Sequence, residues 1–559
     1  MSGPGSAAPA VLGWLRTYRR GDLGGDVGAG IVVAMMMIPQ GMAYALVAGL
    51  PPVAGLYAGI VPALLYALFG TSSTQSVGPM AIIALMTASA LAPLASPGSA
   101  LYGVLAAQLA LVSGAVLLAC GLLRVGFLAN FFSRPVMNGF TLGSAVVIAL
   151  GQMPTLLGAA PPHVHGPSAM LGAGSVALLL FARGWLAPLL RRLGMPRGAA
   201  DVAAKLAPML LVLGGIALVA ALRLDHMGVR VIGAVPAGLP RLALAASAVH
   251  WQELVKPAFL IGFMSFLIAM SGAQTLALKR GEKLHTNREL AGLGLANIGS
   301  ALSGGFPVTG SLSRSAVNVA AGARTQLAGV VTAALLAGAL VLPAAWLGLL
   351  SLLPLPVLAA TIIVAVLGML DWSTLRTAWR YDRADALALL ATAGGVLLLG
   401  VEAGVVLGLL LSLGTMIWRE SRPHIAVLGR IPHTEHFRNV DRYAVQTDRG
   451  VLLLRIDAGL FFGNIEAVSR RVEEALAAHG DARELVLVLS AVNAIDSSAL
   501  FGLLDLNRAL ARRHIRLHMA EVKGPVLDRL RASTLLRELS GRLFLSTANA
   551  WDALARHDT

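Results

Sequence analysis

The residues best suited to chemistry lie in one stretch, Gly304 to Arg324, where an arginine stands among small hydroxylated residues inside an apolar region. Pro307 and Gly310 disfavour a continuous helix, so the pattern predicts a new helix that begins near Thr309 or Gly310, with Ser311 in its first turn. About 13 residues separate this start from the next glycine, which is roughly 20 Å of helix against a hydrocarbon core of about 30 Å. We therefore expect the helix to begin inside a membrane.

Arg314 lies one turn into this helix, where an isolated charge is costly. The free N–H groups and the positive dipole end of the helix add to that charge, so an anion is the expected ligand. Broken backbone at this depth also requires protein or a water-filled cavity around it. The alternative is that Arg314 pairs with a carboxylate or extends to the interface, while the glycines and the proline only kink the segment.

The composition supports a membrane setting. The chain has 559 residues, of which 57% are hydrophobic and 13% charged, and this excludes an ordinary soluble enzyme. The net charge of +15 does not imply a nucleic-acid partner, because the basic residues lie mainly between apolar segments. Cys120 is the only cysteine, and no P-loop or complete metal motif is present, so we expect no metal, no cofactor and no ATP-driven step.

Apolar segments fall into two sets of seven, which predicts a polytopic α-helical membrane protein with fourteen transmembrane segments. The first set covers residues 27–46, 52–69, 77–93, 101–122, 127–152, 170–190 and 204–222. The second set covers residues 254–278, 290–305, 309–322, 326–350, 355–371, 384–400 and 402–418. With a cytoplasmic N-terminus, most basic loops lie inside, so we expect an inner-membrane protein with both termini in the cytoplasm.

The two sets also match in kind. The third segment begins with a Ser/Thr run from Gly70, followed by Gly78, Pro79 and a short apolar helix, and the tenth begins in the same way. Short segments interrupted by Gly and Pro at corresponding positions are typical of inverted-repeat transporters, in which two half-helix starts converge on a site at the membrane midplane.

The character of the chain changes near Val440. Residues 451–456 and 484–492 read as buried strands and residues 469–480 as an amphipathic helix, which predicts a small soluble α/β domain. We therefore divide the chain into a cytoplasmic N-terminal segment (1–25), an anion-transport domain (26–420), a linker (421–439) and a cytoplasmic domain (440–559).

Asp496 and Ser497 follow a strand and precede an apolar helix in this last domain. The structural interpretation is a helix N-cap, for which Asp and Ser are preferred. The alternative is phosphorylation of Ser497 or Ser498, which would add about −1.5 to −2 charge at the helix start.

Four stretches together resemble the SulP sulfate-permease family, relatives of prestin and of animal anion exchangers. They are IPQGMAYALVAGLPPVAGLYAG (38–59), GTSSTQSVGP (70–79), TNREL (286–290) and GLANIGSALSGGFPVTGSLSRSAVN (294–318), and the C-terminal domain resembles the STAS module with its DSS motif. The resemblance implies a seven-plus-seven inverted repeat with core and gate domains, a homodimer and elevator-like movement of the core. By position, it implies that the anion contacts Gln40, Tyr44, Gly78, Pro79, Met80, Thr309, Gly310, Ser311 and Arg314.

One departure from the family pattern matters for coupling. Many members carry a carboxylate in helix eight at the position that Ile268 fills here, and no Asp or Glu occurs between Lys256 and Arg280. Proton coupling through that position is therefore not expected. Asp26 and Glu402 are other acids near membrane segments, and we interpret them as an interfacial residue and a loop residue.

These observations predict a secondary-active transporter or exchanger of a small anion, of the sulfate, bicarbonate, chloride or dicarboxylate class, with no covalent chemistry. Two alternatives stay open: an uncoupled anion channel on the same scaffold, and an anion-responsive sensor that signals to a cytoplasmic protein partner through the STAS-like domain.

Overall fold

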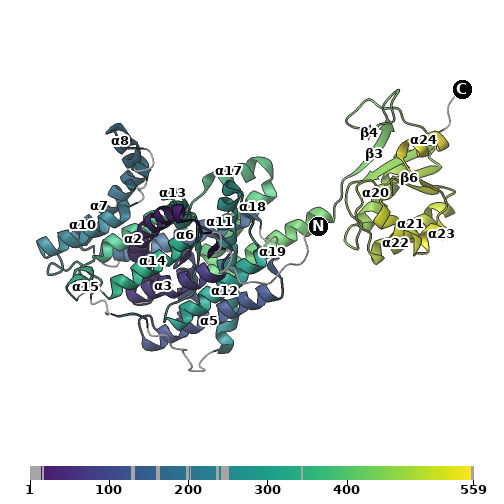
Figure 1. Cartoon of the computed structure of the whole chain (residues 1–559). Coiled ribbons are helices and arrows are strands. Elements are labelled where there is room, and N and C mark those ends of the chain that lie inside the picture. Colours follow the sequence, from purple (N-terminus) through teal and green to yellow (C-terminus); the bar gives the residue numbers. More distant parts are fainter. Residues whose placement is uncertain are drawn as a thin grey trace. The chain divides into compact units, whose positions relative to one another are not determined.

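The computed structural model describes residues 14–15, 18–127, 133–158, 164–196, 200–201, 203–204, 206–233, 238–240, 251–341 and 344–555. The chain divides into two compact units, Met1–Ser412 and Leu413–Thr559 (Figure 1). Each unit is described by itself below.

The first unit is built of helices. Those before residue 250 are η1 (Arg20–Asp22), α2 (Leu23–Val47), α3 (Pro52–Phe69), α4 (Ala81–Leu91), α5 (Ala100–Leu122), α6 (Arg134–Leu157), α7 (Gly166–Phe181), η3 (Ala182–Leu186), α8 (Ala187–Arg192) and α10 (Ala207–Leu222). Those after it are α11 (Trp251–Arg280), α12 (Thr286–Leu302), α13 (Leu312–Ala320), α14 (Leu327–Leu340), α15 (Ala344–Ser351), α16 (Leu355–Leu367), α17 (Trp372–Tyr381), α18 (Arg383–Leu399) and α19 (Val401–Glu420).

Each of the fourteen predicted segments overlaps one of these helices. Among the described residues, eight helical stretches are long and apolar enough to cross a membrane, and three shorter apolar helices accompany them. The prediction of a polytopic helical membrane protein is confirmed. The short helices α15 and α17, and the one-turn π-helix η3 between α7 and α8, were not predicted.

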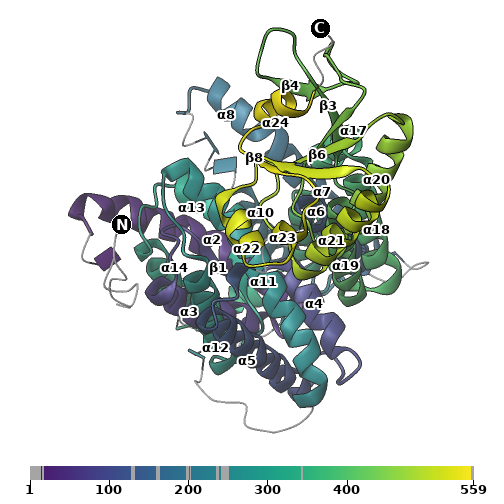
Figure 2. The same cartoon turned by 90° about the vertical axis from the view of Figure 1, so that its right-hand side faces the viewer.

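Close helix packing in this unit depends on small residues. Helix α12 packs against α5 and α3, and the three helices lie side by side in Figure 2. A Cβ atom added to Gly114 of α5 would lie 2.7 Å from the carbonyl oxygen of Gly294 on α12, so both helices need glycine where they cross. Such small-residue contacts let helix backbones approach each other in a membrane protein.

Two breaks in the helices meet in a short ribbon. Strand β1 (Ser76–Gly78) precedes α4, strand β2 (Thr309–Ser311) precedes α13, and the two strands pair antiparallel. The predicted helix start near Thr309 or Gly310 is therefore two to three residues too early: those residues form the ribbon, and the helix begins at Leu312 with Ser311 as its N-cap. Sequence periodicity could not show this pairing, because its partners are more than 230 positions apart.

The second unit is an α/β domain around one six-stranded sheet of order β4-β3-β5-β6-β7-β8. Its strands are β3 (Ile425–Arg430), β4 (Phe437–Asn439), β5 (Val451–Ile456), β6 (Glu484–Val488), β7 (Arg516–Ala520) and β8 (Leu543–Phe544). Its helices are α20 (Ile465–Ala478), α21 (Ser497–Arg512), α22 (Gly524–Arg531), α23 (Leu535–Glu538) and α24 (Thr547–Leu554). Strands β5 to β8 are parallel, and each face of the sheet has its own apolar cluster.

Asp496 caps α21 as the structural interpretation requires. Its Oδ1 accepts a 2.7 Å hydrogen bond from the Ala499 N–H, and its Oδ2 accepts one of 2.9 Å from the Phe462 N–H. Ser497 and Ser498 are the first two residues of the helix and are exposed. Their phosphorylation stays a prediction.

Candidate anion site

Arg314 is buried in the first turn of α13, with 1% of its surface exposed. Its Nη1 donates a 2.8 Å hydrogen bond to the carbonyl oxygen of Pro79, and its Nε lies 3.4 Å from Oγ of Ser76. Within the described part of the chain, Nη2 has no hydrogen-bond partner. The side chain therefore does not extend to an interface, which argues against the alternative that the segment is only kinked. Part of the guanidinium charge is left uncompensated.

The ribbon holds the two halves of the site in register. Ser76 lies opposite Ser311, and Gly78 lies opposite Thr309. The N–H of Ser76 also donates to Oγ of Ser315 at 2.9 Å, so the start of β1 is bound to α13 as well as to β2. Residues from the third and tenth predicted segments are thereby placed in direct contact.

Two predicted site residues are glycines for steric reasons. A Cβ atom on Gly78 would lie 1.9 Å from Cε of Met37, and a Cβ atom on Gly310 would lie 1.6 Å from Nε2 of Gln75. Real Cβ atoms do not approach other atoms this closely, so a side chain at either position would push its neighbour away from the ribbon.

Hydroxyl groups border the start of α13. Oγ of Ser311 caps the helix by accepting from the Arg314 N–H at 3.5 Å, and it lies 3.1 Å from Oγ of Ser313. Oγ1 of Thr309 donates a 2.5 Å hydrogen bond to the carbonyl oxygen of Ser265 on α11. Thr309 is thus committed to positioning the ribbon, whereas Ser311 keeps its hydroxyl at the helix end.

The start of α4 offers unoccupied donors. Met80 is its N-cap residue and provides no side-chain hydrogen bond to the first turn. The N–H groups of Ala81, Ile82 and Ile83 come before the first intrahelical bonds, so they and the positive end of the helix dipole are available to an anion.

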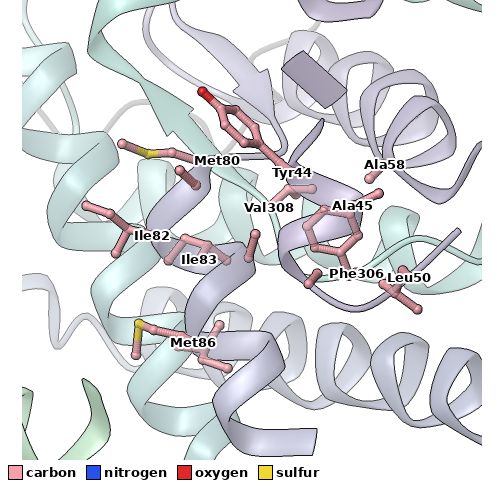
Figure 3. Packing of buried hydrophobic residues seen from close by; sticks show 14 of the residues in the cluster. Tyr44, Ala45, Leu50, Ala58, Met80, Ile82, Ile83, Met86, Phe306 and Val308 are labelled. Atoms are coloured by element: carbon pink, nitrogen blue, oxygen red, sulfur yellow. The ribbon is translucent and has the colours of Figure 1, made fainter. Parts of the chain in front are cut away.

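Gln40 and Tyr44 come from α2, which continues through Pro39 without ending. Gln40 is half-buried and Tyr44 is buried one turn further along. Figure 3 shows Tyr44 and Met80 at the same end of a cluster of buried apolar residues, with Met86 at the opposite end. The structure therefore brings Tyr44 from α2 to the start of α4, as the site requires.

The position expected to lack a coupling carboxylate lies in α11. Ile268 is half-buried and packs against the main apolar cluster of this unit. Ser265, one turn earlier in α11, contacts Thr309 of the ribbon, so α11 borders the site with a stretch that contains no Asp or Glu.

Two other acids differ from their expected settings. Asp26 is fully buried. Its Oδ1 accepts hydrogen bonds from the N–H groups of Arg324 (2.7 Å) and Thr325 (3.0 Å). We expected an interfacial side chain and find a loop anchor instead. Glu402 lies in the first turn of α19 and not in a loop.

Sequence reasoning missed the residues that support the ribbon from behind. Gln75 and Ser315 both contact it, and Glu289 of α12 binds the loop that leads to it. The Ser/Thr run before Gly78 and the TNREL stretch were visible signals. Their roles depend on contacts between distant segments and could not be assigned without coordinates.

Comparison with known families gives two matches. The sulfate permease family matches residues 23–392, and the STAS domain matches residues 442–550. These ranges correspond to the helical unit and to the α/β unit.

Similar curated proteins cover nearly the whole chain. A "Probable sulfate transporter" of Mycobacterium tuberculosis is 36% identical over 570 residues, covering 98% of each chain. "Sulfate transporter 4.1, chloroplastic" of Arabidopsis thaliana is 35% identical over 528 residues, covering 90% of this chain and 76% of that one. Among solved structures, the murine Solute Carrier 26 family member A9 anion transporter in the inward-facing state has a TM-score of 0.87 at 20% identity, covering 99% of this chain and 96% of that one.

Proposed function

The chain belongs to the sulfate permease family, and from this premise we propose that it is a secondary-active transporter or exchanger of a small anion across the inner membrane. The anion would lie beside the β1–β2 ribbon, between the starts of α4 and α13. Its polar contacts would come from Arg314, Ser311 and the first N–H groups of α4.

One observation carries this proposal: the buried guanidinium of Arg314 has a nitrogen that finds no partner among the described residues. Removing a charge from water costs several kcal/mol unless an opposite charge and hydrogen bonds compensate it. An anion would supply both, and two helix starts would share the replacement of its hydration shell. A neutral or cationic substrate would leave the guanidinium uncompensated.

The proposed transport step needs no covalent chemistry. The ribbon, α4 and α13 would move as part of a core domain against a gate domain in an elevator-like manner, and access to the site would alternate. Termini and a STAS domain in the cytoplasm fit the positive-inside pattern of the loops. The homodimer in this proposal rests on the resemblance to the family. Because Ile268 carries no charge, coupling to protons through this position of α11 is not part of the proposal.

Sulfate is the first substrate to test, since the relatives from Mycobacterium and Arabidopsis are named sulfate transporters. Purified protein in liposomes loaded with unlabelled sulfate is expected to accumulate labelled sulfate by counter-flow. Bicarbonate, chloride and a dicarboxylate, each loaded in turn, would define the range of substrates. Anion current without counter-flow would contradict exchange and favour an uncoupled channel. Anion binding without any flux would favour a sensor that signals through the STAS domain to a cytoplasmic partner.

A further inference from the structure

Glu289 is a buried acid without a cationic partner among its hydrogen bonds. It lies on α12 with 1% of its surface exposed. Its Oε1 accepts from the N–H groups of Thr71 (2.7 Å) and Ser72 (2.9 Å) and from the Thr71 hydroxyl. Its Oε2 lies 2.7 Å from the hydroxyl oxygen of Tyr66 on α3. The carboxyl group thus binds the loop that enters β1.

A chain of hydrogen bonds continues from Glu289 to the ribbon. The Tyr66 hydroxyl oxygen also lies 2.9 Å from Oε1 of Gln75. Nε2 of Gln75 donates a 3.1 Å hydrogen bond to the carbonyl oxygen of Ala269 on α11, and the same amide packs against the backbone of Gly310. Protonation at one end can therefore act on a residue of the candidate anion site.

The protons in this chain can be counted. A phenol has one proton, but Tyr66 lies within hydrogen-bond distance of two acceptor oxygens, one on Glu289 and one on Gln75. If Glu289 is protonated at Oε2, it donates to Tyr66, Tyr66 donates to Gln75, and every contact is a hydrogen bond. With a proton on Glu289, each contact from Glu289 to Gln75 is a hydrogen bond.

Loss of that proton would require a second arrangement. Tyr66 would then donate to the ionised Glu289, and the Gln75 amide would have to rotate so that its Nε2 donates to Tyr66. Its Oε1 would then face the Ala269 carbonyl oxygen, and two acceptors at the present 3.1 Å repel each other. The Gln75 side chain would have to leave α11, and the packing on Gly310 would change with it.

A hollow borders this chain of groups. A hollow with about 380 Å³ of atom-free space, including its open mouth, is lined by Tyr66, Gln75 and Ser76 among others. Asn318 and Gln326 also line it, and their side-chain oxygens are buried without hydrogen-bond partners. Buried polar atoms without protein partners are the groups that an enclosed water molecule satisfies.

Few other charges act on Glu289. Helices α3 and α5, which pack against α12, contain no Asp, Glu, His, Lys or Arg. Helix α11 also packs against α12, and its charged residues lie only near its two ends, at 253, 256, 279 and 280. Towards the loop, Ser73 donates to Glu282, which pairs with Arg280 at 2.7 Å. Arg314 faces Ser76 and Pro79 on the ribbon. Tyr66 is therefore the one ionisable group that directly contacts the Glu289 carboxyl group in the described structure.

We propose that Glu289 is a proton-binding site, and that its proton controls the anion site through Tyr66 and the Gln75 amide. This places a coupling group on α12, although α11 has none at the position of Ile268. The control of the anion site rests on the proposed transport function, whereas proton binding by Glu289 does not.

Infrared difference spectroscopy of the full-length protein tests proton binding directly. At neutral pH, the wild-type protein should show the C=O stretching band of a buried carboxylic acid. Glu289→Gln should lack this band, and its amide can donate to Tyr66 in place of the acid, so the fold should persist. The control Glu282→Gln should keep the band. A band that survives in Glu289→Gln, or that is missing from the wild-type protein, would overturn the proposal.

Sulfate flux in liposomes tests the connection to the anion site. An inward proton gradient of about one pH unit should raise sulfate uptake by about fivefold or more in the wild-type protein and in Glu282→Gln. Glu289→Gln should retain counter-flow but lose this response, and Tyr66→Phe should retain the acid band but lose most of the response. An unchanged gradient response in either variant would contradict the relay. Absence of sulfate counter-flow in the wild-type protein would count against the proposed function, and the infrared result would still decide proton binding.

Discussion

The guanidinium of Arg314 donates a 2.8 Å hydrogen bond to the carbonyl oxygen of Pro79, so a side chain from the first turn of α13 reaches the residue two positions before α4. This bond joins segments 235 positions apart. It fixes the guanidinium beside both helix starts and leaves Nη2 available to a ligand.

Replacing Arg314 by Gln should reduce sulfate counter-flow by at least about 30-fold, because loss of a buried, hydrogen-bonded charge typically costs 2–5 kcal/mol of binding. Arg324→Gln is the matched control, since Arg324 is largely exposed and pairs with Asp22. Its counter-flow should stay within about twofold of the wild-type rate. Equal losses in the two variants would indicate a general charge effect and not a site at the ribbon.

Gly55→Ala should destabilise the helical unit. A Cβ atom on Gly55 of α3 would lie 1.9 Å from the carbonyl oxygen of Gly41 on α2, and backbone atoms cannot move aside as a flexible side chain can. We expect a loss of about 1–3 kcal/mol, seen as a lower unfolding temperature of the purified protein, together with slower transport because Gln40 precedes Gly41. Gly28→Ala in α2 has open space around its Cβ atom and should be neutral or slightly stabilising.

The α/β unit should lose stability in mild acid through His518. Nδ1 of this buried histidine accepts from the Arg542 N–H at 2.9 Å, so Nε2 carries the proton and donates to Glu484. Burial lowers the pKa of His518 below its usual 6.5, although Glu484 opposes the shift. Below about pH 6.5 the unfolded chain binds a proton that the folded domain does not. The free energy of unfolding therefore decreases as the pH decreases.

Urea unfolding of residues 413–559 at several pH values would measure this effect, because this unit has its own sheet and apolar clusters. The decrease between about pH 7 and pH 5 should be smaller in His518→Gln, whose side chain does not titrate. A decrease of the same size in the variant would assign the pH dependence to other groups.

Asp496→Ala should cost about 1–2 kcal/mol in the same unfolding measurement, because it removes the cap of α21 and the acceptor of the Phe462 N–H. Asp496→Asn keeps an acceptor oxygen and should lose less than half as much. If the two variants were equally unstable, the negative charge and not the hydrogen bonds would be the stabilising feature.

The sequence was sufficient for features that depend on local pattern. Apolar length located the helices, and the glycines and Pro307 indicated that the backbone is broken before the helix containing Arg314. The pairing of β1 with β2 could not be derived, because three-residue strands carry no periodicity. Glu289 was equally hidden: an acid next to Arg288 at a helix start is typical of an exposed first turn, and only the loop at Thr71 explains its burial.

The backbone pairing of Ser76 with Ser311 and of Gly78 with Thr309 limits how the molecule can cycle. Sliding one repeat past the other would break the hydrogen bonds of the β1–β2 ribbon. Buried backbone amides would then lack partners, and little water is available to replace them. In the transport step proposed above, an anion beside the β1–β2 ribbon would therefore move together with both repeats, and the sliding surfaces would lie elsewhere in the protein.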